Sequence, residues 1–532
     1  MSRVRFASRN YFSAVLFTVM TLAAGFVATP WLLRWLGAER FGAYRVTFDW
    51  FGYLSFLELG LGGALLPLLA QALGRDQQDK VKDLLAASIR AYMAITGAMV
   101  LAGLLLVAFI NRLITVSPQN VRDLRLGCLL GLASLLWLPL AAPFRALTDA
   151  RQRSYWITVL LTMQSLLATA TGLFLAWRNW GITGQFIAFL IAGSAFNVAL
   201  IWAGIRRYPG VLVRAVTRKY DKSASGELWK LNVPTYVVNM CGRVSLLTDN
   251  IVVAAILGPV AVVPLILTQR LAVMAQGQLQ GVGNASWAGL AELHARGEKD
   301  TFQRRVIELT GLTCVLAIAC LVPIAAFNRP FVGLWVGESH YGGQWMTLFA
   351  GMNAFLLSLL SLWGWVFTGT GEVRRVMRPL IIQTLFNFVA SVLLTKPLGA
   401  VGPLVGTFIG FMCVTVWSFP LQLRKTFGIS ARKLLAAVVK PVALGVPYVV
   451  GLWLFERVYA PDNWFELGGE MLVSALLYLA LAWLLVLTPE GREMWRTRIG
   501  LFRRRTGERP VDPPTILSPP TAEASLEEAR SE

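Results

Sequence analysis

The chain has 532 residues, of which 56% are hydrophobic and only 15% are charged, and its formal net charge is +20. Soluble globular domains carry about 25% charged residues, so this composition excludes an ordinary soluble protein. Long apolar runs recur from residue 11 to residue 488, which indicates an all-α, polytopic membrane protein.

Fourteen apolar runs are long enough to cross a membrane. A helix needs about 20 apolar residues to span a hydrocarbon core of about 30 Å. The predicted spans are residues 11–33, 46–70, 88–110, 126–144, 155–177, 182–204, 229–257, 259–288, 306–327, 346–368, 379–395, 402–420, 437–456 and 468–488. The first run is expected to be a retained helix, because it is long enough to span and lacks a convincing small-residue cleavage site.

Basic residues are divided unequally between the two sets of loops. Fourteen spans put both termini on one side, and 37 of the 49 Lys and Arg residues lie in the tails and loops of that side. The positive-inside rule therefore predicts that both termini are cytoplasmic. Topology accounts for the basic charge, so no nucleic-acid partner is expected.

A weak internal repeat relates the two halves of the chain. The matched segments are 36–37 with 257–258, 151–153 with 373–375, and 181–193 with 399–411, at nearly constant offsets of 221, 222 and 218. They occur in the same order relative to the spans, which indicates a duplication. Six helices per copy is an even number, so both copies insert in the same orientation.

This repeat predicts two parallel six-helix bundles around a central cavity, with two extra helices. The expected parts are an N-terminal lobe (1–204), a cytoplasmic linker (205–228), a C-terminal lobe (229–430), helices 13 and 14 (431–488), and a cytoplasmic tail (489–532) that is first basic and then disordered.

Charged residues inside the spans are the first functional candidates. A charge near the bilayer centre costs at least ~2.5–3.5 kcal/mol, so such a residue usually faces protein or water. Glu58 lies in the second span beside Gly60, Gly63 and Ala64, which are predicted to allow close helix packing. Glu58 faces the arginines of the second lobe, acts as an ion-coupling carboxylate, or is a protonated acid bonded to a neighbouring helix.

Two further acids join Glu58 as candidates. Asp49 is the counterpart of Arg270 in the first repeat, at the offset of 221. Asp249 lies in the seventh span. The predicted ion-coupling residues are therefore Glu58, Asp49 and Asp249.

Two neighbouring spans each carry a stripe of polar residues. At 100° per residue, each of the following sets falls on or near one helix face: Asn232, Asn239, Arg243 and Asn250 in the seventh span, and Gln269, Gln276, Gln280 and Asn284, with Arg270 at the edge, in the eighth. Two such faces favour an aqueous cavity for a polar, anionic ligand, because arginine binds phosphate in a bidentate manner.

The predicted substrate-binding residues are Arg243, Arg270, Asn239, Gln276 and Gln280. The alternative is that the amides pair between helices and that Asp249 or Glu308 neutralises the arginines within one lobe.

Cysteines and histidines give no indication of a metal site. All five cysteines fall inside predicted spans without metal-ligand spacing, which is typical of core packing. His294 and His340 lie in loops on opposite sides of the membrane. Neither a metal nor another cofactor is expected.

The stretch LLRWLGAERFGAYRVTFDWFGYLSFLELGLGGAL, residues 32–65, resembles the start of the bacterial polysaccharide transporter family, the Wzx-type flippases of the multidrug/oligosaccharidyl-lipid/polysaccharide exporter superfamily. The matching elements are Leu36-Gly37, Phe41-Gly42 with Tyr44, the run 59–62, and Asp249 before Leu257-Gly258 in the second half.

The resemblance implies a two-lobed, alternating-access flippase of the bacterial inner membrane. Such proteins carry polyprenyl-pyrophosphate-linked oligosaccharide repeat units through a cationic cavity, for O-antigen, capsule or exopolysaccharide synthesis. A proton or sodium gradient is the expected energy source. The expected partners are the lipid-linked oligosaccharide, the membrane, and a polysaccharide polymerase with its export machinery.

Three other functions are less well supported. A lipid II-type flippase is expected to carry an arginine in its first span, which this chain lacks. A multidrug exporter of the same superfamily usually has twelve helices and an acidic or aromatic cavity. A membrane-embedded enzyme needs catalytic groups on sizeable outer loops, and the largest outer loop offers only Glu338 and His340. The chain is therefore expected not to be an enzyme.

Overall fold

A computed structural model describes residues 3–58, 60–213, 233–487 and 492–493. Most of the predicted linker and of the predicted tail lies outside the described residues. The chain divides into two compact units, Met1–Tyr478 and Leu479–Glu532, and the packing described below lies within the first.

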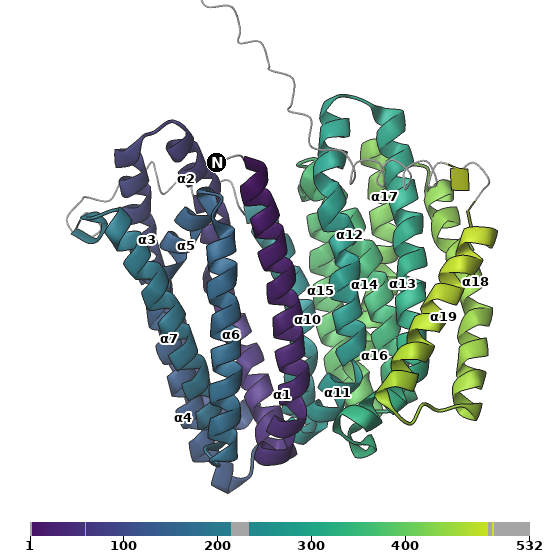
Figure 1. The fold of residues 1–532 in the computed structure, drawn as a ribbon, viewed down its shortest axis with the longest axis horizontal. Coiled ribbons are helices and arrows are strands. Elements are labelled where there is room, and N and C mark those ends of the chain that lie inside the picture. The colour runs from purple at the N-terminus through teal and green to yellow at the C-terminus, as the bar shows by residue number, and fades with distance from the viewer. Residues whose placement is uncertain (1–2, 59, 214–232, 488–491, 494–532) are drawn as a thin grey trace, which may run out of the picture. The chain divides into compact units, whose positions relative to one another are not determined.

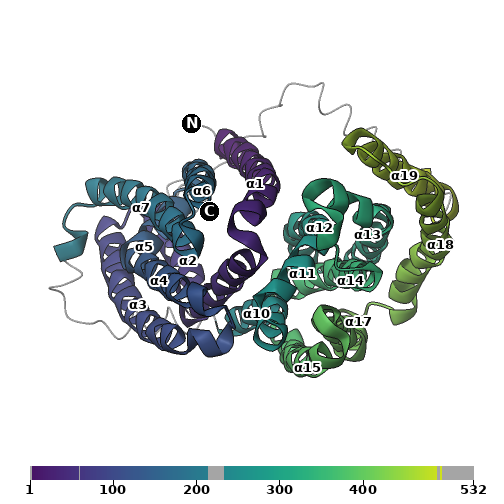
Figure 2. The same cartoon turned by 90° about the horizontal axis from the view of Figure 1, so that it is seen from below.

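Helices are the regular secondary structure of the first half over its described residues (Figure 1). Its helices are α1 (Arg3–Leu54), α2 (Leu61–Gly74), α3 (Gln78–Leu113), α4 (Pro118–Ser134), α5 (Leu138–Ala150), α6 (Ser154–Trp177) and α7 (Gly181–Arg207). Short 3-10 segments occupy Ser55–Glu58 and Leu135–Trp137. Figure 2 shows α1 to α7 gathered in one bundle.

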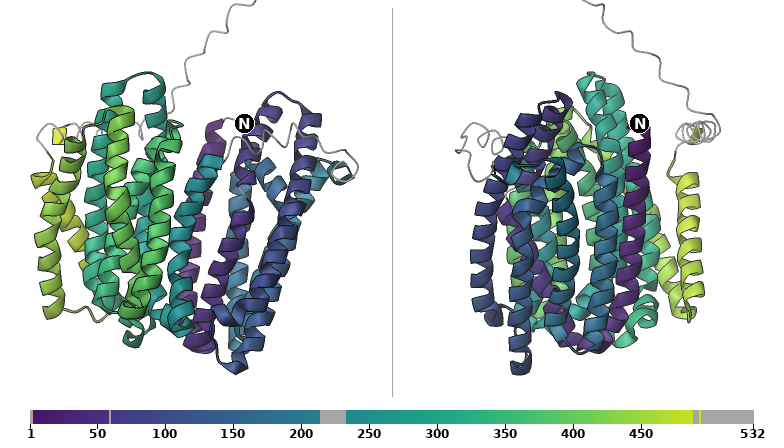
Figure 3. Two further views of the ribbon diagram at one scale, coloured as in Figure 1. Left: turned by 180° about the vertical axis from the view of Figure 1, so that it is seen from behind. Right: turned by 60° about the vertical axis from the view of Figure 1, so that its left-hand side comes forward.

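The second half forms a bundle of its own (Figure 2). Its helices are α10 (Val233–Leu257), α11 (Val262–Thr268), α12 (Arg270–Ala295), α13 (Lys299–Val336), α14 (Gln344–Gly369), α15 (Arg374–Leu398), α16 (Gly402–Gly410) and α17 (Val416–Phe427), the last two joined by a π segment at Phe411–Thr415. After them come α18 (Ala431–Val458) and α19 (Trp464–Leu485). Helix α18 packs against α13 at the edge of this bundle (Figure 3).

The all-α membrane class is confirmed. Over the described residues, ten helices are long and apolar enough to cross a membrane, or up to twelve if each bent pair is one span. Of the ten, Arg374–Phe427 covers two predicted spans, and Phe12–Glu58 covers nearly all of the first predicted span and the first half of the second. The structure is therefore compatible with fourteen crossings.

The backbone supports the predicted duplication. Gly37 has φ 75° and ψ 165°, and Gly258, its counterpart at the offset of 221, has φ 89° and ψ 164°. Side chains rarely adopt this conformation, so glycine is favoured at both turns. Gly181 (φ 57°) and Gly399 (φ 64°) likewise share a positive φ at the predicted offset of 218.

The α2–α3 and α12–α13 turns also make equivalent backbone hydrogen bonds. The residues with positive φ are Asp76 and Gly297, again at the offset of 221. The backbone hydrogen bonds coincide at the same offset: Gln77 N to Ala72 O with Glu298 N to Leu293 O, and Gln78 N to Asp76 O with Lys299 N to Gly297 O. This turn was not recognised in the sequence.

One of the predicted pairings is out of register. Residues 151–153 were matched with 373–375, at an offset of 222. The positive-φ residues of these two turns are Gln152 and Gly371, which gives an offset of 219 instead. The basic residues of the two turns are therefore not at equivalent positions, because turn geometry rather than side-chain charge fixes the equivalence.

The second predicted span is broken near its middle. Helix α1 ends at Leu54, a 3-10 turn follows, and α2 begins after Gly60, which has φ 71°. Gly60 therefore serves the break, and not only the close helix packing that the sequence predicted. A break inside a membrane frees backbone carbonyls, which need donors. The Tyr236 hydroxyl of α10 donates to the Phe56 carbonyl.

The eighth predicted span is bent by 53° between α11 and α12. The Thr268 carbonyl at the bend accepts a hydrogen bond from Asn328 Nδ2 at 2.8 Å. Asn328 is buried and also donates to Thr347 Oγ1 at 2.9 Å. These bonds satisfy the carbonyl at the bend, and Arg270 is the first residue of the helix that follows, α12.

Candidate functional site

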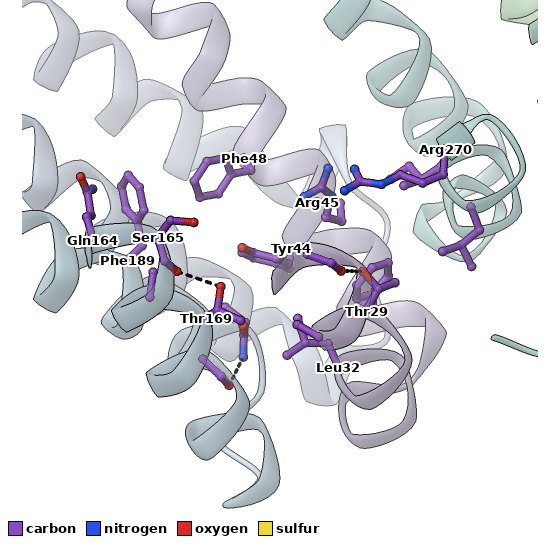
Figure 4. A pocket seen from close by; sticks show the side chains of 18 of the residues that line it. Thr29, Leu32, Tyr44, Arg45, Phe48, Gln164, Ser165, Thr169, Phe189 and Arg270 are labelled. Carbon is purple, nitrogen blue, oxygen red and sulfur yellow. Dashed lines mark hydrogen bonds between the residues drawn. The ribbon is translucent and has the colours of Figure 1, made fainter. Parts of the chain in front are cut away.

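A cavity of about 390 Å³ lies where the two lobes meet. Helices α1, α6 and α7 form one side, and α11, the start of α12 and the end of α13 form the other (Figure 4). The residues that line it are Phe17, Gly25, Ala28, Thr29, Leu32, Phe41, Tyr44, Arg45, Phe48, Leu161, Gln164, Ser165, Ala168, Thr169, Gly172, Gln185, Phe189, Ile266, Leu267, Arg270 and Trp335.

Two arginines from different lobes meet in this cavity. Figure 4 shows the guanidinium groups of Arg45 and Arg270 pointing toward each other, and the two side chains interact electrostatically. Within the described residues, neither has an acidic partner within ion-pair distance. Arg270 Nε is buried and has no hydrogen-bond acceptor. Such an arrangement is costly unless an anion completes it.

The local backbone favours negative charge as well. Arg270 is the first residue of α12, so the positive end of that helix dipole lies at the cavity. Gly25 leaves room for the guanidinium, since a Cβ there would lie 3.2 Å from Arg270 Nη2. Asp49 follows Arg45 by one helical turn, but it does not line the cavity and accepts a hydrogen bond from Asn250 Nδ2 at 2.8 Å.

The opposite wall is aromatic and polar. Tyr44, Phe48 and Phe189 face the cavity with Gln164 and Ser165 (Figure 4). Phe48 and Phe189 pack edge to face, with ring centroids 5.0 Å apart. Gln164 Oε1 is buried without a donor, so this wall can accept a hydrogen bond from a ligand. The cavity therefore offers a cationic donor from each lobe, together with an apolar platform and an acceptor on the wall formed by α1, α6 and α7.

The structure separates the predicted substrate-binding residues. Arg270 lines the cavity, whereas Gln276 is buried further along α12 and Gln280 is half-buried there, and neither lines it. Asn239 lies on α10, and its side chain is outside the described part of the structure. The predicted eighth-span stripe is interrupted at Gln269, where the helix bends.

Arg243 does not share the cavity with Arg270. It is exposed on α10, and its Nη1 lies 3.4 Å from Ser55 Oγ at the break in the second span. This contact joins the two lobes. In this cavity Arg270 is accompanied by Arg45, and the substrate-binding role of Arg243 stays a prediction.

The three predicted carboxylates lie in three different environments. Glu58 accepts a hydrogen bond from the Tyr92 hydroxyl of α3 at 2.7 Å, as in the structural alternative considered for it. Asp49 bonds to Asn250 of the other lobe. Asp249 is buried within the second lobe beside Thr407, and its Oδ1 has no hydrogen-bond partner.

The predicted spans 11–33 and 46–70 leave Arg45 in the loop between them, on the outer side of the membrane. The helix resumes directly after Gly37, so Arg45 lies two turns inside it. The spacing of Tyr44, Phe48 and Phe51 at intervals of three and four residues is a helical signal that already includes this position.

Residues 7–287, more than half of the chain, match the family described as "Polysaccharide biosynthesis protein". The chain is also 23% identical over 506 residues to the "Uncharacterized membrane protein EpsK" of Bacillus subtilis (strain 168), covering 90% of this chain and 94% of that protein.

Solved structures share the fold. The "Lipid II flippase MurJ, inward closed conformation" has a TM-score of 0.63 at 16% identity and covers 90% of this chain and 98% of its own. An inward-facing multidrug resistance MATE family transporter of the MOP superfamily has a TM-score of 0.63 at 14% identity, with coverage of 77% and 94%. At sequence identities this low, the similarity shows a shared fold and no more.

Proposed function

Because the chain belongs to the polysaccharide biosynthesis protein family, we propose that it is a flippase for polyprenyl-pyrophosphate-linked oligosaccharides of the bacterial inner membrane. It moves the repeat unit from the cytoplasmic to the outer leaflet by alternating access, with both termini in the cytoplasm. The resemblance of residues 32–65 to Wzx-type flippases supports the same activity.

The convergence of Arg45 and Arg270 without an acidic partner within ion-pair distance among the described residues carries this proposal. A pyrophosphate accepts several charge-assisted hydrogen bonds, and guanidinium groups bind it in a bidentate manner. The aromatic wall and the free acceptor of Gln164 suit the adjoining sugar. A cationic drug, in contrast, would be repelled by the arginine pair.

The two arginines also suggest how transport proceeds. Arg45 belongs to the first lobe and Arg270 to the second. When the lobes rock, the distance between the guanidinium groups changes, so the same motion that opens the cavity weakens its hold on the anion. Binding and release are thereby linked to one conformational change.

The test replaces each arginine with glutamine, which keeps a polar side chain but removes the charge. Arg45→Gln and Arg270→Gln should each lower polysaccharide export at least tenfold in cells that depend on this protein, since a charge-assisted hydrogen bond contributes about 1.5–3 kcal/mol. Arg34→Gln, an exposed position on the same helix, is the matched control. Normal export by the double variant would overturn the proposal.

We further propose that a proton or sodium gradient drives the cycle through Asp249. This carboxylate is buried and has an oxygen without a partner, whereas Glu58 already bonds to Tyr92. Asp249→Asn should abolish the response of reconstituted transport to an imposed gradient, because the amide cannot change its charge. Glu58→Gln should reduce that response by less than about twofold, since its amide oxygen still accepts the Tyr92 bond. The reverse result would assign coupling to Glu58.

A further inference from the structure

A second cavity, of about 400 Å³, lies at the junction of α13, α14 and α18. It shares no lining residue with the first cavity. Its lining residues are Val322, Ala325, Ala326, Arg329, Tyr341, Gln344, Trp345, Thr347, Leu348, Val449, Val450, Trp453 and Glu456. We call it the α13–α18 groove.

The walls and the rim of the groove differ in chemistry. Leu348, Val449 and Val450 are exposed apolar side chains within membrane-spanning helices, so this face is in contact with lipid. The rim holds two exposed tryptophans, Trp345 and Trp453. Tryptophan is enriched where a membrane meets water, which puts the rim at the level of the lipid headgroups.

Two charged groups on the rim retain unused hydrogen-bonding capacity. Arg329 Nε donates to Glu338 Oε1 at 2.7 Å. Arg329 Nη1 makes no hydrogen bond within the described residues. Glu456 interacts electrostatically with Arg329, but among the described residues it has no hydrogen-bond or ion-pair partner. Arg329 Nη2 also lies 2.5 Å from Glu338 Oε1, so this guanidinium is ion-paired and Nη1 is the nitrogen that keeps unused donors. The rim therefore presents the Nη1 donors of Arg329 and, near them, the Glu456 carboxylate as an acceptor.

We infer that the α13–α18 groove binds a membrane phospholipid with a phosphate and a primary ammonium in its headgroup, as in phosphatidylethanolamine. The phosphate accepts from Arg329, the ammonium donates to Glu456, and an acyl chain lies along Val322, Leu348 and Val450. A headgroup without a cation leaves Glu456 unpaired beside a phosphate, and a quaternary ammonium has no N–H to donate to it.

The proposal can be tested on the purified full-length protein by native mass spectrometry with defined lipids. Phosphatidylethanolamine should be retained about tenfold more strongly than phosphatidylglycerol, as one charge-assisted hydrogen bond predicts. Glu456→Gln should remove this preference. Arg329→Gln should weaken both lipids, because both carry a phosphate. Glu372→Gln, which breaks an exposed ion pair with Arg375 elsewhere, is the control.

A groove-filling variant, Val450→Trp, distinguishes lipid bound in the groove from lipid retained nonspecifically with the detergent. Position 450 is half exposed, so the larger side chain can be accommodated without unfolding, and an unchanged melting temperature will verify this. It should abolish retention of all phospholipids. Equal retention of the two lipids by the parent protein, an unaltered preference in Glu456→Gln, or full binding by Val450→Trp would each overturn the assignment.

Discussion

The two lobes come from one repeat, yet they interrupt the matching helix at different depths. In the first lobe the second span is broken at Ser55–Gly60, and in the second lobe the eighth span bends at Gln269. At an offset of 221, Gln269 corresponds to Phe48 and Gly60 to Gly281. The position of the break decides which side chain stands at a helix start, and only the second lobe presents an arginine there.

The two breaks are also stabilised from different places. The bend at Gln269 is held by Asn328, which belongs to the same lobe. The break after Leu54 accepts hydrogen bonds from Tyr236 and Arg243, which belong to the other lobe. The bend of the second lobe is therefore expected to persist throughout a transport cycle, whereas the break of the first lobe depends on how closely the lobes approach.

Removing the support of the second-lobe bend should have the largest effect. Asn328→Leu leaves the Thr268 carbonyl buried without a donor, which costs about 1–3 kcal/mol of unfolding free energy. It also releases the start of α12, so export should fall as far as in Arg270→Gln. Thermal unfolding and export assays measure the two effects.

Asn353→Leu supplies the control for this prediction. Asn353 is buried in the same lobe and donates to the Leu404 carbonyl at 2.8 Å, away from the bend. Its loss should cost similar stability and leave export largely intact. If both variants export equally, the bend does not position Arg270.

An intermediate effect is expected from Gly60→Ala in the first lobe. An alanine at φ 71° costs about 1–2 kcal/mol, so the break is destabilised relative to a continuous helix. Gly97→Ala is the control, because a Cβ at this position in α3 meets no other atom. Chemical denaturation in detergent compares the two, and equal stability would show that the break does not need its glycine.

The smallest effect is expected from Tyr236→Phe, which removes the donor to the Phe56 carbonyl. If this bond forms only when the lobes are close, its loss should shift the lobe equilibrium about fivefold without lowering the melting temperature. Spin-label distances between α3 and α14 report the shift. Tyr448→Phe removes a hydroxyl that donates to the Ser474 carbonyl between α18 and α19, and it should leave those distances unchanged.

Much of the fold follows from apolar periodicity, because span length and repeat order are local properties of the chain. The breaks do not follow from it. The bend at Gln269 depends on Asn328, which lies on α13, and no signal near Gln269 specifies that partner. Gly60, in contrast, was visible in the sequence, and a glycine at mid-span is a signal for a break as much as for close packing.

The residues of the candidate site likewise include some that the sequence predicts and some that it does not. Arg270 was predicted because a lone arginine in an apolar span is conspicuous. Arg45 was missed because it stands among three basic residues between two apolar runs, where loop and helix look alike. Arg243 was expected beside Arg270 but does not line the same cavity. A helical wheel gives direction around one axis and does not say where two bent helices meet.

The pair Arg45 and Arg270 also affects the rate at which an empty carrier returns to its starting conformation. Two like charges held together in a half-buried site repel each other by roughly a few kcal/mol. A loaded carrier is spared this repulsion, because the anion lies between the guanidinium groups. An unloaded carrier meets it whenever Arg45 and Arg270 approach. The empty return would then limit turnover, and small anions or raised ionic strength would speed it.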